Sequence, residues 1–146
     1  MIDTGLSRLY SPELLALATE LYRFPLSDDL LQRASGRSRT CGSTIDIGLA
    51  TDAGGRIERI GMRISACAVG QASCALLARE AAGVSSQEIS ETRDGLVDWL
   101  DGKRELPDWP GLAALAPARG LTGRHGAILL PWNAAVEALS NAPASS

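Results

Sequence analysis

The residues best suited to chemistry are the three cysteines, Cys41, Cys67 and Cys74. A thiolate is both a nucleophile and a soft metal ligand. Cys41 has Arg37 and Arg39 within four residues, and cationic neighbours lower the pKa of a thiol. Cys67 stands where a helix is predicted to begin, and the free N–H groups and dipole at a helix start also favour a thiolate. The pattern therefore predicts two reactive thiols, at Cys41 and Cys67.

A predicted β-hairpin separates these two thiols. From Thr44 the apolar residues recur at every second position, which is typical of a strand with one buried face. A turn follows at "DAGG", and a second alternating run comes after it. Ile57 is out of phase with Ile60, so we expect a bulge or a late strand start near Glu58. Because a hairpin folds back on itself, Cys41 before its entry and Cys67 after its exit should lie at one end of the sheet.

The remaining chain is mostly helical in pattern. Helical spacing, capping residues and glycine stops predict helices over residues 12–23, 67–82, 86–101, 111–117 and 124–139, the last with Pro131 inside it or at a kink. Residues 26–40 are polar, and "ASGRSR" at 34–39 has the composition of an exposed loop. We therefore expect an α+β fold, in which a small antiparallel sheet (the hairpin, with room for a third strand) packs against several helices, as one domain over residues 1–146.

Cys74 and the tryptophans are expected to have structural roles. Cys74 lies two helical turns beyond Cys67 on the same face, about 10 Å further along, which is too far to share a mononuclear metal. It is expected in the core. Trp99 and Trp132 are expected to pack helices, and Trp109 to cover a loop. The lone histidine, His125, allows three interpretations: a surface or capping residue, a third soft ligand, or a proton shuttle.

Composition limits the function classes. The net charge is −3, the isoelectric point is near 5.1 and aromatic residues make up 4 % of the chain, so neither phosphate-backbone binding nor a base-stacking platform is indicated. No apolar run approaches the ~20 residues of a membrane span, and no signal-peptide pattern opens the sequence. An odd number of cysteines without an export signal indicates free thiols in a reducing compartment, and we expect a cytoplasmic protein without membrane or nucleic-acid partners.

The central segment resembles a known family. The stretch "SRTCGSTIDIGLATDAGGRIERIGMRISACAVGQASCALL" is similar to the scaffold proteins of iron–sulfur cluster assembly, of the IscU, SufU and NifU N-terminal type. In that family a Cys-Gly-Asp segment opens a hairpin and a Gly-Cys-Ala-x-x-x-Ala-Ser segment opens a long helix. Cys41-Gly42 matches the first segment and the run from Cys67 to Ser73 matches the second. The segments "LYSPELLALA" and "LLPWNAAVEAL" resemble the flanking helices.

The sequence departs from this pattern at the ligands. The family's aspartate is Ser43 here, and its third cysteine falls on Gly126 or Ala127, depending on the register. The resemblance then implies a reduced set of sulfur acceptors, Cys41 and Cys67, with His125 as the further candidate metal ligand. Two thiolates alone do not complete four-coordinate zinc or the usual four-ligand [2Fe–2S] site.

Two function classes follow from the resemblance. The first is a scaffold or sulfur acceptor that receives sulfur from a cysteine desulfurase and binds iron or a labile iron–sulfur cluster, with zinc as an alternative metal and apo-proteins or a chaperone as further partners. The second is a non-catalytic interaction protein that keeps the fold and modulates the assembly machinery. Neither is an enzyme. A third interpretation, a cysteine hydrolase with Cys41 as nucleophile and His125 as base, requires their side chains within about 3 Å.

Overall fold

The computed structural model describes residues 11–141 and has the predicted α+β architecture. Its helices are α2 (Pro12–Thr19), α3 (Ala68–Glu80), α4 (Ser86–Leu100) and α5 (His125–Ser140), and its 3-10 turns are η1 (Glu20–Arg23), η2 (Leu112–Ala118) and η3 (Thr122–Arg124). Its strands are β1 (Gln32–Arg37), β2 (Thr44–Thr51) and β3 (Ile57–Ser65). The described residues therefore form one small sheet packed against helices, as the sequence predicts.

The predicted hairpin is formed by β2 and β3. The sheet is antiparallel with the order β1-β2-β3, and Ile45, Ile47 and Leu49 of β2 are buried. Ala50 pairs with Arg59, but the next residue of β2, Thr51, pairs with Ile57. Glu58 is thereby left as the extra residue of a β-bulge, which confirms the irregularity predicted from the phase of Ile57.

The first strand corrects one prediction. Residues 34–39 were expected in an exposed loop, yet β1 runs through Arg37 and pairs with β2 along its length. Its sequence, "QRASGR", has one apolar residue, Ala34, and no β-branched residue. Pairing and the packing of α5 determine this strand, because strand preference depends strongly on context. Gly36 contributes by its small size, since a Cβ there would lie 3.2 Å from the Leu130 side chain of α5.

The helix starts follow the predicted capping residues. The Ser11 hydroxyl accepts a hydrogen bond from the Leu14 N–H at 3.1 Å, with proline in the first turn of α2. Ser85 and Glu88 form a capping box at the start of α4. Gly83, at φ +85°, adopts the left-handed conformation that ends the segment after α3.

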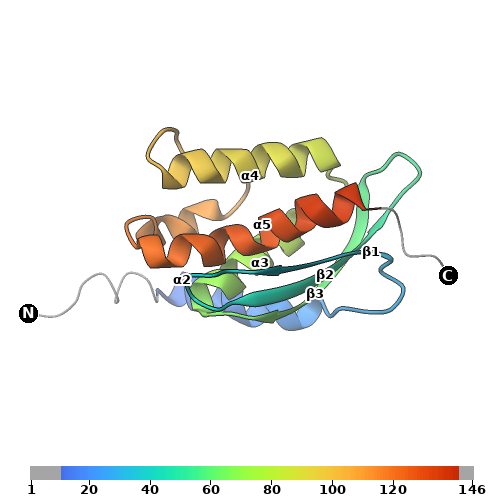
Figure 1. Ribbon diagram of the computed structural model, residues 1–146, viewed down its shortest axis with the longest axis horizontal. Coiled ribbons are helices and arrows are strands. Elements are labelled where there is room, and N and C mark those ends of the chain that lie inside the picture. The colour runs from blue at the N-terminus through green and yellow to red at the C-terminus, as the bar shows by residue number, and fades with distance from the viewer. Residues whose placement is uncertain (1–10, 142–146) are drawn as a thin grey trace, which may run out of the picture.

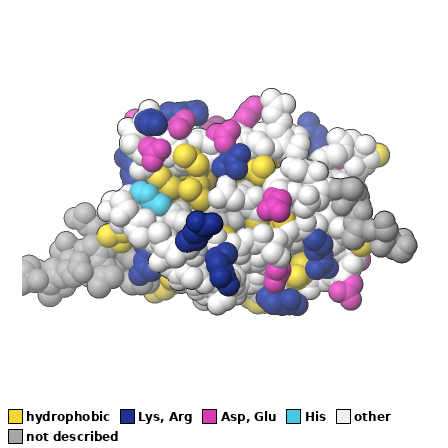
Figure 2. Space-filling model, viewed as in Figure 1, with side chains coloured by type: hydrophobic (Ala, Val, Ile, Leu, Met, Phe, Trp, Pro, Cys, Tyr) yellow, Lys and Arg dark blue, Asp and Glu magenta, His cyan; other side chains and the backbone are white. Residues whose placement is uncertain are grey.

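The layers are clearest in Figure 1, where α5 covers one face of the sheet and α4 stacks on the far side of α5. Helix α2 packs against α3. In Figure 2, acidic and basic side chains are interspersed over the visible face, in line with the small net charge. Among residues 11–141, none of the helices has the length and apolarity that crossing a bilayer requires.

A buried hydrogen-bonded link joins α3 to α5. The Ser73 hydroxyl donates to the Ile128 carbonyl at 2.7 Å and accepts from the Trp132 indole N–H at 3.1 Å. Trp132 also meets Trp109 edge to face, with ring centroids 4.9 Å apart. Trp109 is itself buried and donates to the Leu76 carbonyl at 2.8 Å. The two tryptophans and Ser73 thus fix the helix that begins at Cys67 against the last helix.

We expect Ser73→Ala to destabilise the protein by about 1–3 kcal/mol, because the substitution leaves the buried Trp132 N–H without its acceptor. Urea denaturation of the two proteins measures the change in the free energy of unfolding. Ser140→Ala is the matched control, since that hydroxyl bonds the Val136 carbonyl at an exposed site. Equal stabilities of the two variants would contradict a structural role for this link.

Candidate functional site

Cys41 and Cys67 lie on the wall of one pocket. Thr44, the first residue of β2, pairs with Ser65, the last residue of β3, so the loop before β2 and the start of α3 meet at this end of the sheet. The pocket has a volume of about 210 Å³ and is lined by Cys41, Gly42, Ser43, Ser65, Ala66, Cys67 and Arg124. The structure thus brings together the two thiols that the sequence singled out.

A tight turn holds Cys41 in place. The Ser38 N–H donates to the Ser43 carbonyl at 2.8 Å, and the Gly42 N–H donates to the Ser38 carbonyl at 2.9 Å. Gly42 has φ +71°, a left-handed conformation that glycine adopts without steric cost. The Cys-Gly pair therefore has a local explanation: glycine allows the turn that presents the preceding thiol.

Two hydroxyl groups flank the Cys41 sulfur. Its Sγ lies 3.3 Å from Ser38 Oγ and 3.0 Å from Ser43 Oγ. Hydrogen bonds from Ser38 and then Ser43 hold the pKa of the Cys41 thiol below its usual range, with a smaller contribution from the positive charge of Arg124. Hydrogen bonding to the charged form favours that form, so this environment favours a sulfur anion.

The cause of the lowered pKa differs from the predicted one. Arg37 and Arg39 are exposed, and the side chains that lower the pKa of Cys41 are those of Ser38, Ser43 and Arg124. The cation that does contribute is Arg124, the last residue of η3. Arg124 is far from Cys41 in the sequence, so only the fold identifies its role. The one sequence signal was its place directly before the candidate ligand His125.

Cys67 is the N-cap residue of α3, as the small-residue pattern predicts. It is half-buried, and its carbonyl accepts a hydrogen bond from the Gln71 N–H at 3.0 Å. The Gln71 side chain donates to the Ala66 carbonyl at 2.8 Å. Gln71 therefore ties down the backbone on both sides of the second thiol.

Cys74 is fully buried in the core, as expected, and burial raises the pKa of its thiol. This cysteine is therefore suited to packing rather than to reaction.

His125 is not brought to the thiols. Its Nε2 is hydrogen-bonded to the Arg119 carbonyl at 2.5 Å, and it does not line the pocket of Cys41 and Cys67. Within residues 11–141, no three His, Cys, Asp or Glu side chains are grouped closely enough to hold a metal ion. The three-ligand set Cys41, Cys67 and His125 is thus not assembled, and the geometry does not support the nucleophile–base pair of a cysteine hydrolase.

The structure distinguishes the two residues, Gly126 and Ala127, that could correspond to the third cysteine of the family pattern. A Cβ on Gly126 would collide with Ser38 Oγ and lie 3.1 Å from Thr40 Oγ1, beside the turn that carries Cys41. Ala127 is fully buried and packs toward Gly70 of α3. Gly126 therefore faces the thiol site, and the Ser38 hydroxyl occupies the space that a side chain there would need.

A second, more open cavity adjoins the first. It has a volume of about 680 Å³ and is lined by Thr40, Cys41, Gly120, Leu121, Thr122, Gly123 and Arg124. Cys41 and Arg124 line both cavities. Cys41 is consequently accessible from a wider opening, whereas Cys67 lines only the smaller pocket of the two.

Comparisons with known proteins agree with this fold. No protein-family model matches the sequence, and no curated protein does either. Among solved structures, the N-terminal part of a nitrogen-fixing NifU-like protein from Brucella abortus superposes with a TM-score of 0.84 at 25 % identity, over 93 % of this chain and 95 % of that one.

A second similar structure is a putative iron–sulfur cluster assembly scaffold protein for the SUF system from Fervidobacterium islandicum, with a TM-score of 0.75 at 22 % identity, over 90 % of this chain and 96 % of that one. The similarity thus extends over nearly the whole of each chain, and it agrees with the resemblance seen in the cysteine-containing motifs. In its fold and in its cysteine-containing motifs, the chain is similar to scaffold proteins of the NifU N-terminal and SufU type.

Proposed function

We propose that this protein is an iron–sulfur cluster assembly scaffold that accepts sulfur from a cysteine desulfurase, with Cys41 as the principal acceptor. The observation that carries the proposal is the environment of Cys41: a thiol between two hydroxyl groups and near Arg124, with Cys67 on the same pocket wall. The similarity to a scaffold protein of the SUF system supports the general role.

The proposed reaction is a thiol–persulfide exchange. The Cys41 thiolate attacks the terminal sulfur of the desulfurase's cysteine persulfide, and an S–S bond forms on Cys41. The S–S bond of the donor breaks, and its electron pair leaves with the desulfurase thiolate, so no external oxidant is needed. The Ser38 and Ser43 hydroxyls and Arg124 are placed to stabilise the negative charge on the sulfur of Cys41, and the open cavity provides the approach for the donor.

Iron or a labile cluster is the cargo in this proposal, and the described residues do not complete its coordination. Two thiols share the pocket, Ser43 stands in place of the family's carboxylate, and no group of three ligand side chains exists in residues 11–141. A [2Fe–2S] cluster normally has four protein ligands. Stable holding of a cluster therefore requires donors from outside this part of the chain, for which a desulfurase or a recipient apo-protein is the natural source.

The same incomplete ligand set favours a second candidate function, a non-catalytic protein that binds the assembly machinery and modulates it. The two proposals differ in what the thiols do. If the second holds, Cys41→Ala combined with Cys67→Ala leaves the complex with a desulfurase and its effect on that enzyme intact. Loss of sulfur transfer with retention of the complex supports the acceptor.

Sulfur transfer can be followed on each cysteine separately. With a purified cysteine desulfurase and cysteine, the wild-type protein gains the mass of one sulfur atom on Cys41, as measured by mass spectrometry of peptides after alkylation. Cys41→Ser reduces the labelled fraction at least tenfold. Cys74→Ser is the control and leaves it unchanged, because Cys74 is buried. Undiminished labelling in Cys41→Ser would rule out the proposed acceptor.

Because the pKa of Cys41 is lowered, its thiolate fraction at neutral pH exceeds that of an ordinary thiol, and iodoacetamide alkylates Cys41 faster near pH 7 than it alkylates an ordinary thiol. Ser38→Ala with Ser43→Ala raises that pKa, so alkylation near pH 7 slows several-fold while the rate above about pH 10 is similar. Peptide mass spectrometry follows each cysteine separately. An unchanged pH profile in the double variant would show that the hydroxyls do not tune Cys41.

A further inference from the structure

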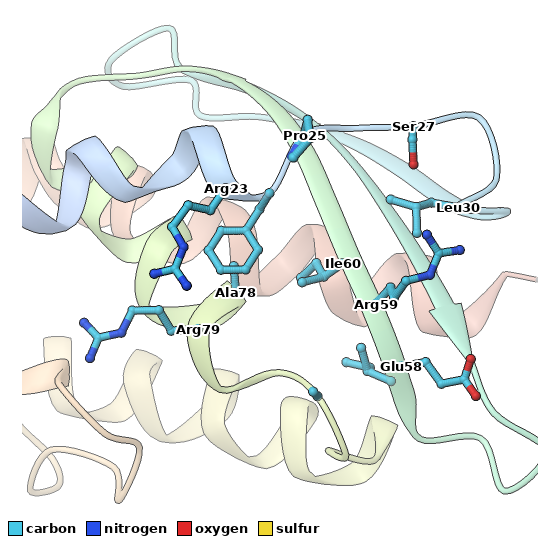
Figure 3. Close-up of a pocket in the computed structure, with 12 residues that line it drawn as sticks. Arg23, Pro25, Ser27, Leu30, Glu58, Arg59, Ile60, Ala78 and Arg79 are labelled. Carbon is cyan, nitrogen blue, oxygen red and sulfur yellow. The ribbon is translucent and has the colours of Figure 1, made fainter.

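A groove at the other end of β3 and α3 has no part in the thiol chemistry. It has a volume of about 430 Å³ and is lined by Arg23, Phe24, Pro25, Ser27, Leu30, Ile57, Glu58, Arg59, Ile60, Ala78, Arg79 and Ala82. Figure 3 shows its apolar floor at Ile60 and Ala78, with Arg23 and Arg79 together at one side and Arg59 and Glu58 at the other. Its composition, an apolar floor with charged margins, is that of a binding site.

The two ends of the groove differ in how their arginines are neutralised. Arg59 forms a close ion pair with Asp29, at 2.6 Å. Arg23 and Arg79 instead share one carboxylate, that of Glu20, at 3.9 and 3.8 Å. These separations are at the outer limit of an ion pair. Two guanidinium groups with one distant carboxylate between them leave net positive charge, so this end of the groove is complementary to an incoming anion.

The groove also borders a strand edge. The Met62 N–H donates to the Phe24 carbonyl at 2.9 Å, on the side of β3 away from β2. In an antiparallel strand the N–H and C=O groups of every second residue point to the same side. Those of Ile60 therefore face the same outer side as those of Met62. An extended peptide that enters the groove would therefore meet backbone groups as well as the apolar floor, which a small anion would not use.

Aromatic residues accompany Arg23, one before it in the sequence and one in the groove. Tyr22, next to Arg23 in η1, is 82 % exposed. The Arg23 guanidinium lies 5.9 Å from the centroid of the Phe24 ring. Tyrosine and arginine are enriched among residues that carry interface energy. Phe24 and the guanidinium groups of Arg23 and Arg79 line the groove itself, and this combination favours a protein segment over a free small molecule.

We propose that this groove docks an acidic segment of a partner protein, with an apolar side chain on the floor and carboxylates at Arg23 and Arg79. Because the groove includes Ala78 and Arg79 near the end of α3 and Cys67 lies at its start, about 18 Å of helix separates docking from chemistry. A partner held there leaves both thiols accessible. The proposal stands independently of the sulfur-acceptor function.

The test uses a fluorescein-labelled synthetic peptide with one leucine flanked on each side by two aspartates, and fluorescence anisotropy as the readout. We expect saturable binding to the wild-type protein, and at least tenfold weaker binding to Arg23→Gln combined with Arg79→Gln. The matched control, Lys103→Gln with Arg104→Gln, removes the same charge at two exposed positions in the loop after α4, and it should bind like the wild type. Similar thermal unfolding of the two double variants confirms that each remains folded.

Two further peptides identify the groove as the site. Replacing the leucine by glycine should weaken binding by removing the apolar contact, and replacing the aspartates by lysines should abolish it. In ¹⁵N-labelled protein, the aspartate peptide should shift amide signals of Phe24, Ile60 and Ala78 and leave those of Cys41 and Cys67 in place. The proposal is overturned by no binding of the aspartate peptide at millimolar concentration, by equal affinity of the two double variants, or by full affinity of the glycine peptide.

Discussion

The pairing of Thr44 with Ser65 at the open end of the β2–β3 hairpin is the constraint on which the candidate site depends. Cys41 and Cys67 are far apart in sequence, and this antiparallel register places the turn before β2 beside the first residue of α3. Buried residues of β2 hold the register, because a slip by one residue would turn Ile45, Ile47 and Leu49 away from the core. The Ser73–Trp132 link then fixes α3 against α5, so the second thiol and Arg124 approach the first from different elements.

At the site, serine hydroxyl groups stand where the family pattern has metal-binding side chains. Ser43 replaces the carboxylate of the family pattern, and Ser38 occupies the space that a side chain at position 126 would need. Both hydroxyls contact the sulfur of Cys41. Hydroxyl groups stabilise a sulfur anion without binding a soft metal strongly. The same two residues thus lower the pKa of the Cys41 thiol and occupy positions where the family pattern has metal donors. In the proposed function, this arrangement favours accepting sulfur over holding a metal.

The sequence predicted the hairpin, its bulge near Glu58 and most helix boundaries, because periodicity, capping serines and glycine stops are local signals. It failed for β1, whose polar residues form a strand only because β2 and α5 are there to pair and pack with it. For the site, the shared position of Cys41 and Cys67 followed from hairpin topology. The sequence did not predict the contribution of Arg124 or the orientation of His125, because both depend on how η3 leads into α5. These two adjacent residues face different surroundings: Arg124 lines the thiol pocket, and His125 bonds the Arg119 carbonyl.

The most direct test of the central claim is the metal content of a variant in which the family's donors are restored. Ser38→Gly makes room, Ser43→Asp supplies a carboxylate and Gly126→Cys supplies a thiol beside Cys41. After incubation with zinc and desalting, we expect this triple variant to retain about one zinc per chain and the wild-type protein to retain almost none, since zinc sites need four donors. Stoichiometric zinc in the wild-type protein, abolished by Cys41→Ser, would contradict the account, because two thiols and two hydroxyls would then suffice to hold the metal.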